Sequence, residues 1–125
     1  MNRLLILLKS IQIIKNWYIL PFVYFKIFRK KYYFLKLKNG KKIKLRNNST
    51  DIHTFTNIWI IEEYLEIENG KNRTIIDIGA HIGLFSIYAL KCNPKEIIAF
   101  EPIKENYNLF KEHIVFGIFS ILLFL

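Results

Sequence analysis

Residues 74–101 read TIIDIGAHIGLFSIYALKCNPKEIIAFE, and this stretch decides the fold. It begins with a short, continuously apolar segment, residues 74–78, and ends with a second one, residues 97–100. Residues 83–90 lie between them and are predicted to be helical, and a further helix is predicted at residues 104–113. Continuously apolar strands that alternate with helices are typical of a parallel sheet buried on both faces. The sequence therefore predicts an α/β fold that contains a strand–helix–strand–helix unit.

A turn that contains two glycines follows the first predicted strand. Gly79 permits a tight turn, and Gly83 lets the start of the next helix pack closely. We expect the backbone amides of this turn to form a donor-rich concave surface for a ligand that carries adenosine and a carboxylate. Asp77 comes directly before the turn, where an acid can reach the amino group of such a ligand. Glu101 lies 18 residues after Gly83, close to the offset of about 20 residues at which an acid binds ribose hydroxyls in dinucleotide folds.

Two alternatives to this interpretation exist. A nicotinamide or flavin site requires glycines in the order G-x-G-x-x-G. Counted from Gly79, the second and third positions hold His81 and Leu84, so that pattern does not match. In the other alternative, the glycines and acids only support an ordinary strand–helix–strand unit and bind no ligand.

The segments DIGAHIGLFS and AFEPIKENYNLFKEHI resemble the first two motifs of the FkbM-type S-adenosylmethionine-dependent methyltransferases. The resemblance covers about residues 16–115. It implies a Rossmann-like class I methyltransferase that uses S-adenosylmethionine and methylates a hydroxyl group of a small-molecule or glycan acceptor. Carried over position by position, the residues that would bind the cofactor are Asp77, Gly79, Ala80, His81, Gly83 and Glu101, with Glu101 on the ribose.

The sequence departs from this family in two places. His81 stands where the family most often has Asn, and we interpret it as a tolerated polar substitution and not as a base. After His113 the family continues through further strands that carry substrate and catalytic residues, whereas here an uncharged tail, residues 114–125, ends the chain. We therefore expect an incomplete fold, truncated at its C-terminus, that is inactive alone or is completed by a partner chain. No catalytic residue is assigned. Arg46 and Asp51 match family positions near the mouth of the cofactor site.

The rest of the sequence indicates three parts. Residues 1–46 form a basic, apolar arm with a β-hairpin, residues 47–73 contain a helix that leads into the core, and residues 74–125 are the first half of the cofactor-binding domain. In the arm, helices are predicted before and after Pro21, where a break is expected. Asn39-Gly40 predicts the hairpin, with a type I′ turn. The middle helix is predicted at residues 52–67.

Charge is distributed unevenly along the chain, which has a net charge of +9. Residues 1–46 contain thirteen Lys or Arg and no acid, whereas the remainder contains six Lys or Arg and ten acids. A basic arm with interleaved aromatic residues indicates contact with an anionic membrane surface or with nucleic acid, or a solvated cationic surface. No specific nucleic-acid motif is present. The alternative to the enzyme is therefore a non-catalytic, membrane-peripheral protein that binds anionic surfaces through this arm.

Other classes of site are disfavoured by the sequence. No segment reaches the roughly 20 apolar residues of a membrane span, so we expect a cytoplasmic protein, with peripheral membrane contact through the arm as the alternative. A single cysteine, Cys92, excludes an internal disulfide. The three histidines show no metal-ligand spacing, and no metal site is expected.

Overall fold

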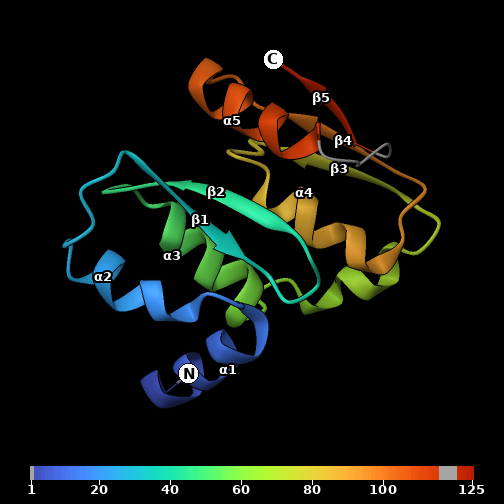
Figure 1. Cartoon of the computed structure of the whole chain (residues 1–125). Helices are drawn as coiled ribbons and strands as arrows, with labels where there is room; N and C mark the ends of the chain where they lie inside the picture. Colours follow the sequence, from blue (N-terminus) through green and yellow to red (C-terminus); the bar gives the residue numbers. More distant parts are fainter. Residues whose placement is uncertain (1, 116–120) are drawn as a thin grey trace. The chain divides into compact units, whose positions relative to one another are not determined.

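Two units, Met1–Ile61 and Glu62–Leu125, make up the chain in a computed structural model that describes residues 2–115 and 121–125. The elements of the first unit (Figure 1) are α1 (Arg3–Ile13), η1 (Trp17–Ile19), α2 (Leu20–Tyr24), β1 (Tyr32–Lys36), β2 (Lys42–Arg46), α3 (Asp51–Phe55) and η2 (Thr56–Ile60).

The break between the first two helices lies earlier than predicted. The prediction of a break near Pro21 is wrong, because Pro21 lies in the first turn of α2, where its missing amide hydrogen costs no helical hydrogen bond. The chain instead leaves α1 at Ile14, which forms an isolated bridge with the hairpin. The side chain of Asn16 ties the chain, just after α1, to strand β1. Its side-chain amide donates to the Phe34 carbonyl (2.9 Å) and its oxygen accepts from the Lys36 amide (2.8 Å).

The predicted hairpin is confirmed, but its turn is of another type. Strands β1 and β2 pair antiparallel from Tyr32↔Arg46 to Lys36↔Lys42. Gly40 has a φ of +88°, while Asn39 has no positive φ, so a type I′ turn is wrong. The Gly40 amide donates to the Leu37 carbonyl (3.1 Å) and the Leu37 amide to the Lys41 carbonyl (2.8 Å). This is the pattern of a three-residue loop with a left-handed glycine at its end.

The helix that follows the hairpin is shorter than predicted. Helix α3 continues as the π-helical turn η2, which ends at Ile60, and the amide of the following residue, Ile61, donates to the Thr56 carbonyl (2.9 Å). Glu62 then adopts a φ of +58°. The Thr56 hydroxyl donates to the Ile52 carbonyl (2.8 Å) and so competes with the backbone ladder, which favours a bulge. The prediction of one helix through residue 67 is therefore wrong.

The second unit contains the α/β part of the fold. Its elements are η3 (Leu65–Gly70), β3 (Thr74–Ile78), α4 (Leu84–Ala89), η4 (Leu90–Cys92), β4 (Glu96–Phe100), α5 (Lys104–Ile114) and β5 (Ile121–Phe124). The strands are parallel and lie in the order β3-β4-β5. This is the 3-2-1 half of a doubly wound sheet, so the predicted fold class is confirmed.

A third strand corrects the expectation for the end of the chain. The sequence predicts two strands in this unit, at residues 74–78 and 97–100, yet a third, β5, pairs with β4 from Ile97↔Ile121 to Phe100↔Phe124. An uninterrupted run of Ile, Leu and Phe suits a parallel strand, because such strands have apolar residues on both faces.

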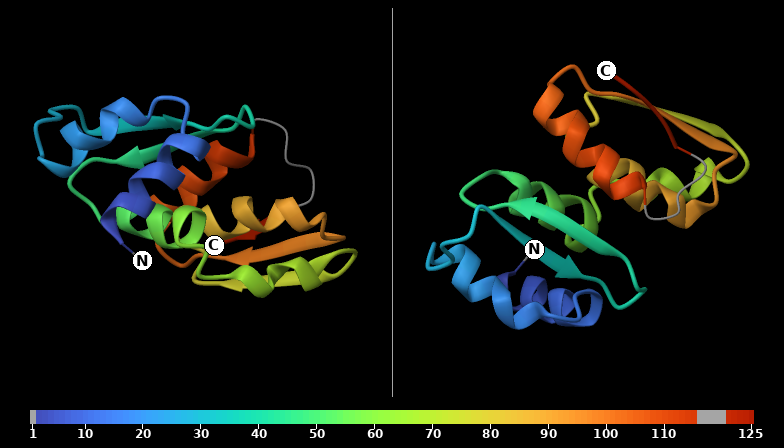
Figure 2. Two further views of the ribbon diagram at one scale, coloured as in Figure 1. Left: turned by 90° about the horizontal axis from the view of Figure 1, so that it is seen from below. Right: turned by 45° about the horizontal axis from the view of Figure 1, so that its top comes forward.

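Only one face of this sheet is covered by helices. Helices α4 and α5 lie on the face that carries Ile97, Ala99 and Ile121, all of which are buried (Figure 2). On the other face, Ile76 is 61% and Ile78 83% exposed. The prediction of burial on both faces is therefore wrong for the described residues. Within the same part of the chain, no helix combines the length and the apolar character that crossing a bilayer requires.

Candidate functional site

The predicted acids lie at the same edge of the sheet. Asp77 is near the carboxyl end of β3, and Glu101 directly follows β4. Because these strands are parallel neighbours, their carboxyl ends meet, and the turn from Gly79 to Gly83 starts there. In doubly wound folds, ligands bind in the crevice outside the carboxyl ends of the strands, where the strand order reverses. In a 3-2-1 half-sheet that point is the end of its first strand, which is β3 here.

Glu101 is a buried carboxylate that ties the turn to the next helix. One oxygen, Oε2, accepts from the His81 amide (2.7 Å). The other, Oε1, accepts from the Ile103 amide (2.8 Å) and the Asn106 side chain (3.3 Å). A carboxylate offers about four acceptor positions. Donors among the described residues occupy three of these positions and leave one for a further donor.

Asp77 is buried and directed toward α4. Its Oδ2 accepts a hydrogen bond of 2.6 Å from the Ser86 hydroxyl. Burial raises the pKa of Asp77 above its ordinary value, the Ser86 hydrogen bond opposes that shift, and the nearby charge of Glu101 adds to it. The two acids therefore sense each other electrostatically.

The amides of the turn are largely engaged within the protein. Those of Gly79 and Ala80 both donate to the Phe100 carbonyl (2.9 Å each), and that of Gly83 donates to the Ala80 carbonyl (2.8 Å). The His81 amide is taken by the carboxylate described above. The expected donor-rich surface is therefore wrong for these four amides. Space remains beside Gly79, because a Cβ built there meets no atom within 4 Å.

Gly83 is required by packing against α5. Its φ is +84°, and a Cβ at this position would lie 2.1 Å from Cδ2 of Phe110, which is fully buried. Nearby, Nδ1 of the buried His113 lies 2.9 Å from the Ile82 carbonyl oxygen. Sequence reasoning did not assign Phe110 and His113 to this site. Their spacing with Asn106 along one helix face was the available signal.

The conformation of His81 gives a physical reason for its place in the turn. Its φ is +55°, and Asn, Asp and His are the side chains most enriched in this left-handed region. The residue thus satisfies the backbone geometry in the same way that Asn would.

Arg46 and Asp51 form an ion pair within the first unit. Nε and one terminal nitrogen of Arg46 donate to the two carboxylate oxygens (3.0 and 2.8 Å), and the Arg46 amide adds a third hydrogen bond (2.9 Å). Asp51 is fully buried. This pair locks the end of β2 to the start of α3. Among the described residues, no group of three or more His, Cys, Asp or Glu is arranged to hold a metal ion.

Comparison with known proteins supports the assignment of the fold. No protein-family profile matches this sequence, and no curated protein matches it. Among solved structures, the S-adenosylmethionine-dependent methyltransferase from Agrobacterium tumefaciens is similar over 77% of this chain and 32% of its own, with 16% identity and a TM-score of 0.58. TYW2 of M. jannaschii, solved with S-adenosylmethionine, is similar over 78% of this chain and 44% of its own, with 23% identity and a TM-score of 0.57.

A third structure is the Pyrococcus abyssi tRNA (uracil-54, C5)-methyltransferase in complex with S-adenosylhomocysteine. It is similar over 78% of this chain and 24% of its own, with 14% identity and a TM-score of 0.53. The chain thus spans less than half the length of each of these proteins. At sequence identities this low, structural similarity is evidence for a shared fold alone. Together with the strand order, it shows that the chain has the Rossmann-like α/β fold found in S-adenosylmethionine-dependent methyltransferases.

Proposed function

We propose that this chain is the cofactor-binding part of an S-adenosylmethionine-dependent methyltransferase of the FkbM type. The observation that carries the proposal is the pair of buried acids, Asp77 and Glu101, at adjacent carboxyl ends of parallel strands. The glycine turn between strand and helix starts at that same edge. The fold and the resemblance of the two motifs support the same choice of cofactor.

The residues at this edge suit such a cofactor in charge and in space. S-adenosylmethionine carries a sulfonium and an ammonium against one carboxylate, and two neighbouring acids favour a cationic ligand. Glu101 would bind a ribose hydroxyl through its remaining acceptor position, and Asp77 would attract the ammonium group. Gly79 leaves room for the ligand to approach the backbone. When bound, the cofactor supplies an electrophilic methyl group, while these residues of the chain hold and orient it.

Calorimetric titration of the full chain with S-adenosylmethionine and S-adenosylhomocysteine tests this proposal. The informative variant is Glu101→Gln, which alters the carboxylate at the end of β4. The matched control is Glu96→Gln at the opposite end of the same strand, where Glu96 accepts a hydrogen bond from the Thr74 hydroxyl (2.9 Å). We expect saturable binding that Glu101→Gln weakens and Glu96→Gln preserves. Absence of saturable binding, or equal effects of the two variants, would contradict the proposal.

For the reaction, we propose transfer of the methyl group to a hydroxyl oxygen of a sugar or another small molecule. This follows from the resemblance to the FkbM type. Because the chain alone is expected to be inactive, the test uses the chain extended by a carboxyl-terminal half of the FkbM type. Radiolabelled methyl groups should then be transferred to a glycan or a small alcohol, with tRNA as a parallel arm. Labelling of tRNA alone would contradict a small-molecule acceptor.

A second candidate, peripheral binding to anionic membranes, is favoured by the surface of the first unit. Its exposed aromatic residues include Tyr18, Phe22 and Phe25, and Phe25 is 76% exposed. Lys15 and Lys26 flank these aromatic residues in the sequence. Such a combination suits the interface of an anionic bilayer. Co-sedimentation of the full chain with vesicles that contain phosphatidylserine should then exceed that with pure phosphatidylcholine and should decline with salt. Equal sedimentation with both vesicles would count against it.

A further inference from the structure

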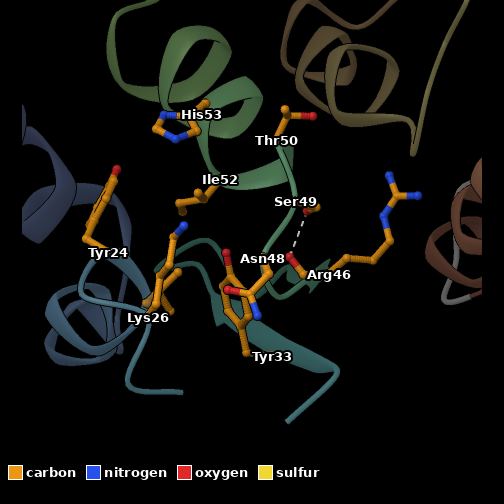
Figure 3. Close-up of a pocket in the computed structure, with 10 residues that line it drawn as sticks. Tyr24, Lys26, Tyr33, Arg46, Asn48, Ser49, Thr50, Ile52 and His53 are labelled. Atoms are coloured by element: carbon orange, nitrogen blue, oxygen red, sulfur yellow. Dashed lines mark hydrogen bonds between the residues drawn. The ribbon is translucent and has the colours of Figure 1, made fainter. Parts of the chain in front are cut away.

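A cavity of about 330 Å³ lies within the first unit, at a distance in sequence from the turn that carries the proposed function. It is bounded by α2 and the segment after it, by β1, and by the loop from β2 into α3. Figure 3 shows the side chains that surround it, among them Tyr24, Lys26, Tyr33, Ile52 and His53. Cavities of this size are at the lower end of the range that holds small-molecule ligands.

The hydroxyl of Tyr33 is the unusual group in this cavity. Tyr33 is only 3% exposed. Within the part of the chain that the structure describes, its oxygen is the buried side-chain polar atom that has no hydrogen-bond partner. The ring is held by an edge contact with Phe28, with centroids 5.8 Å apart. In Figure 3 the hydroxyl points toward the space beside Ile52 and Asn48.

An unpaired buried hydroxyl is costly, which makes a bound partner the natural explanation. Burial raises the pKa of Tyr33, and the charge of Asp51 adds to that effect. The phenol therefore stays neutral and keeps its hydrogen. A neutral phenol can donate this hydrogen to an acceptor, and that donor is unused among the described residues.

The surroundings of this hydroxyl favour an anionic acceptor. Lys26 and His53 are exposed and line the cavity, and no acidic residue lines it. The guanidinium of Arg46 is turned away from the cavity in Figure 3 and is paired with Asp51. Lys26 lies just after α2 in a left-handed helix end (φ +56°), where the Ile27 amide donates to the Phe22 carbonyl (2.9 Å). Val23 and Ile52 supply apolar walls.

We propose that this cavity binds a small organic anion, whose phosphate or carboxylate group accepts a hydrogen bond from Tyr33 and faces Lys26. The apolar body of the molecule packs against Val23 and Ile52. All the residues that form this site belong to the first unit, and the proposal does not depend on whether the chain is a methyltransferase.

Calorimetric titration of the full chain tests the site with four probes: phenyl phosphate, benzoate, inorganic phosphate and neutral benzyl alcohol. The test variants are Tyr33→Phe, which removes only the hydroxyl, and Lys26→Gln at the exposed edge. Tyr32→Phe is the matched control for the first, since Tyr32 is its neighbour on the other face of β1. Lys30→Gln is the matched control for the second, because Lys30 is exposed and does not line the cavity.

We expect phenyl phosphate, benzoate or both to bind, and the preferred one identifies the acceptor group. Each test variant should weaken that binding by about tenfold or more, as the loss of a hydrogen bond to a charged group does, while the controls leave it unchanged. Should Tyr33→Phe fail to fold by circular dichroism, Lys26→Gln decides the test. The proposal is overturned if neither organic anion binds or if benzyl alcohol binds as well as they do. It is equally overturned if inorganic phosphate alone matches phenyl phosphate, or if the test variants behave like their controls.

Discussion

Replacing Gly83 by Ala tests the packing that holds the turn to α5. Two costs are expected. A φ of +84° strains any residue with a Cβ by about 1–2 kcal/mol. The added methyl group would lie 2.1–2.6 Å from three ring atoms of Phe110, a side chain that is fully buried among its neighbours. Overpacking of this kind costs about 1–3 kcal/mol. The variant should therefore lose about 2–5 kcal/mol in the free energy of unfolding.

Gly79→Ala provides the matched control on the same turn. Its φ of +76° carries similar strain, but nothing lies within 4 Å of its Cβ, so it should lose only about 1–2 kcal/mol. Urea denaturation of both variants, followed by far-ultraviolet circular dichroism, measures the difference. A second check is Phe110→Leu, which should cost less in the Gly83→Ala background than alone. Equal losses for the two glycine variants, or no coupling with Phe110, would refute the packing argument.

Three further changes have defined outcomes. Because burial raises the pKa of Asp77 above 3.8, the stabilisation from its proton is complete below that value and is lost as the pH rises through the folded pKa. Asp77→Asn should therefore be more stable than the natural chain near pH 7, with the difference shrinking near pH 4 in parallel urea titrations. Arg46→Ala leaves the buried Asp51 carboxylate without its bidentate partner. It should lower the free energy of unfolding by about 3–5 kcal/mol in urea denaturation, which is more than the loss of an exposed ion pair would cost. Ile78→Thr, at an 83% exposed position, should alter the free energy of unfolding by less than about 0.5 kcal/mol in the same urea titrations. A clearly larger loss would contradict the exposure of this side chain.

Several features of the second unit could be predicted because they depend on residues close together in the chain. Apolar runs at residues 74–78 and 97–100, with a helix between them, predict parallel strands, and β3 and β4 lie there. A glycine after the first strand predicts a tight turn, and Gly79 has the positive φ that such a turn needs. In the first unit, the hairpin at Asn39-Gly40 was predicted for the same reason, although its turn type was not.

Other features were missed because they depend on contacts between distant residues. The sequence of the apolar tail is compatible with an unstructured end or with a strand. Strand β5 forms because this segment pairs with β4. The helix after the hairpin ended early because a threonine hydroxyl competed with its backbone.

Residues 74–101 show most clearly which features follow from the local sequence and which follow from tertiary contacts. The sequence by itself determined that Asp77, the glycine turn and Glu101 would gather at the end of two parallel strands, because chain order and strand direction are enough to bring them there. Only the tertiary structure decided what each group does at that edge. Phe100 and Glu101 take up the amides of the turn, and Phe110 makes the glycine at position 83 necessary. Hydrogen bonds and close packing are decided by which distant atoms meet, and a local pattern does not contain that information.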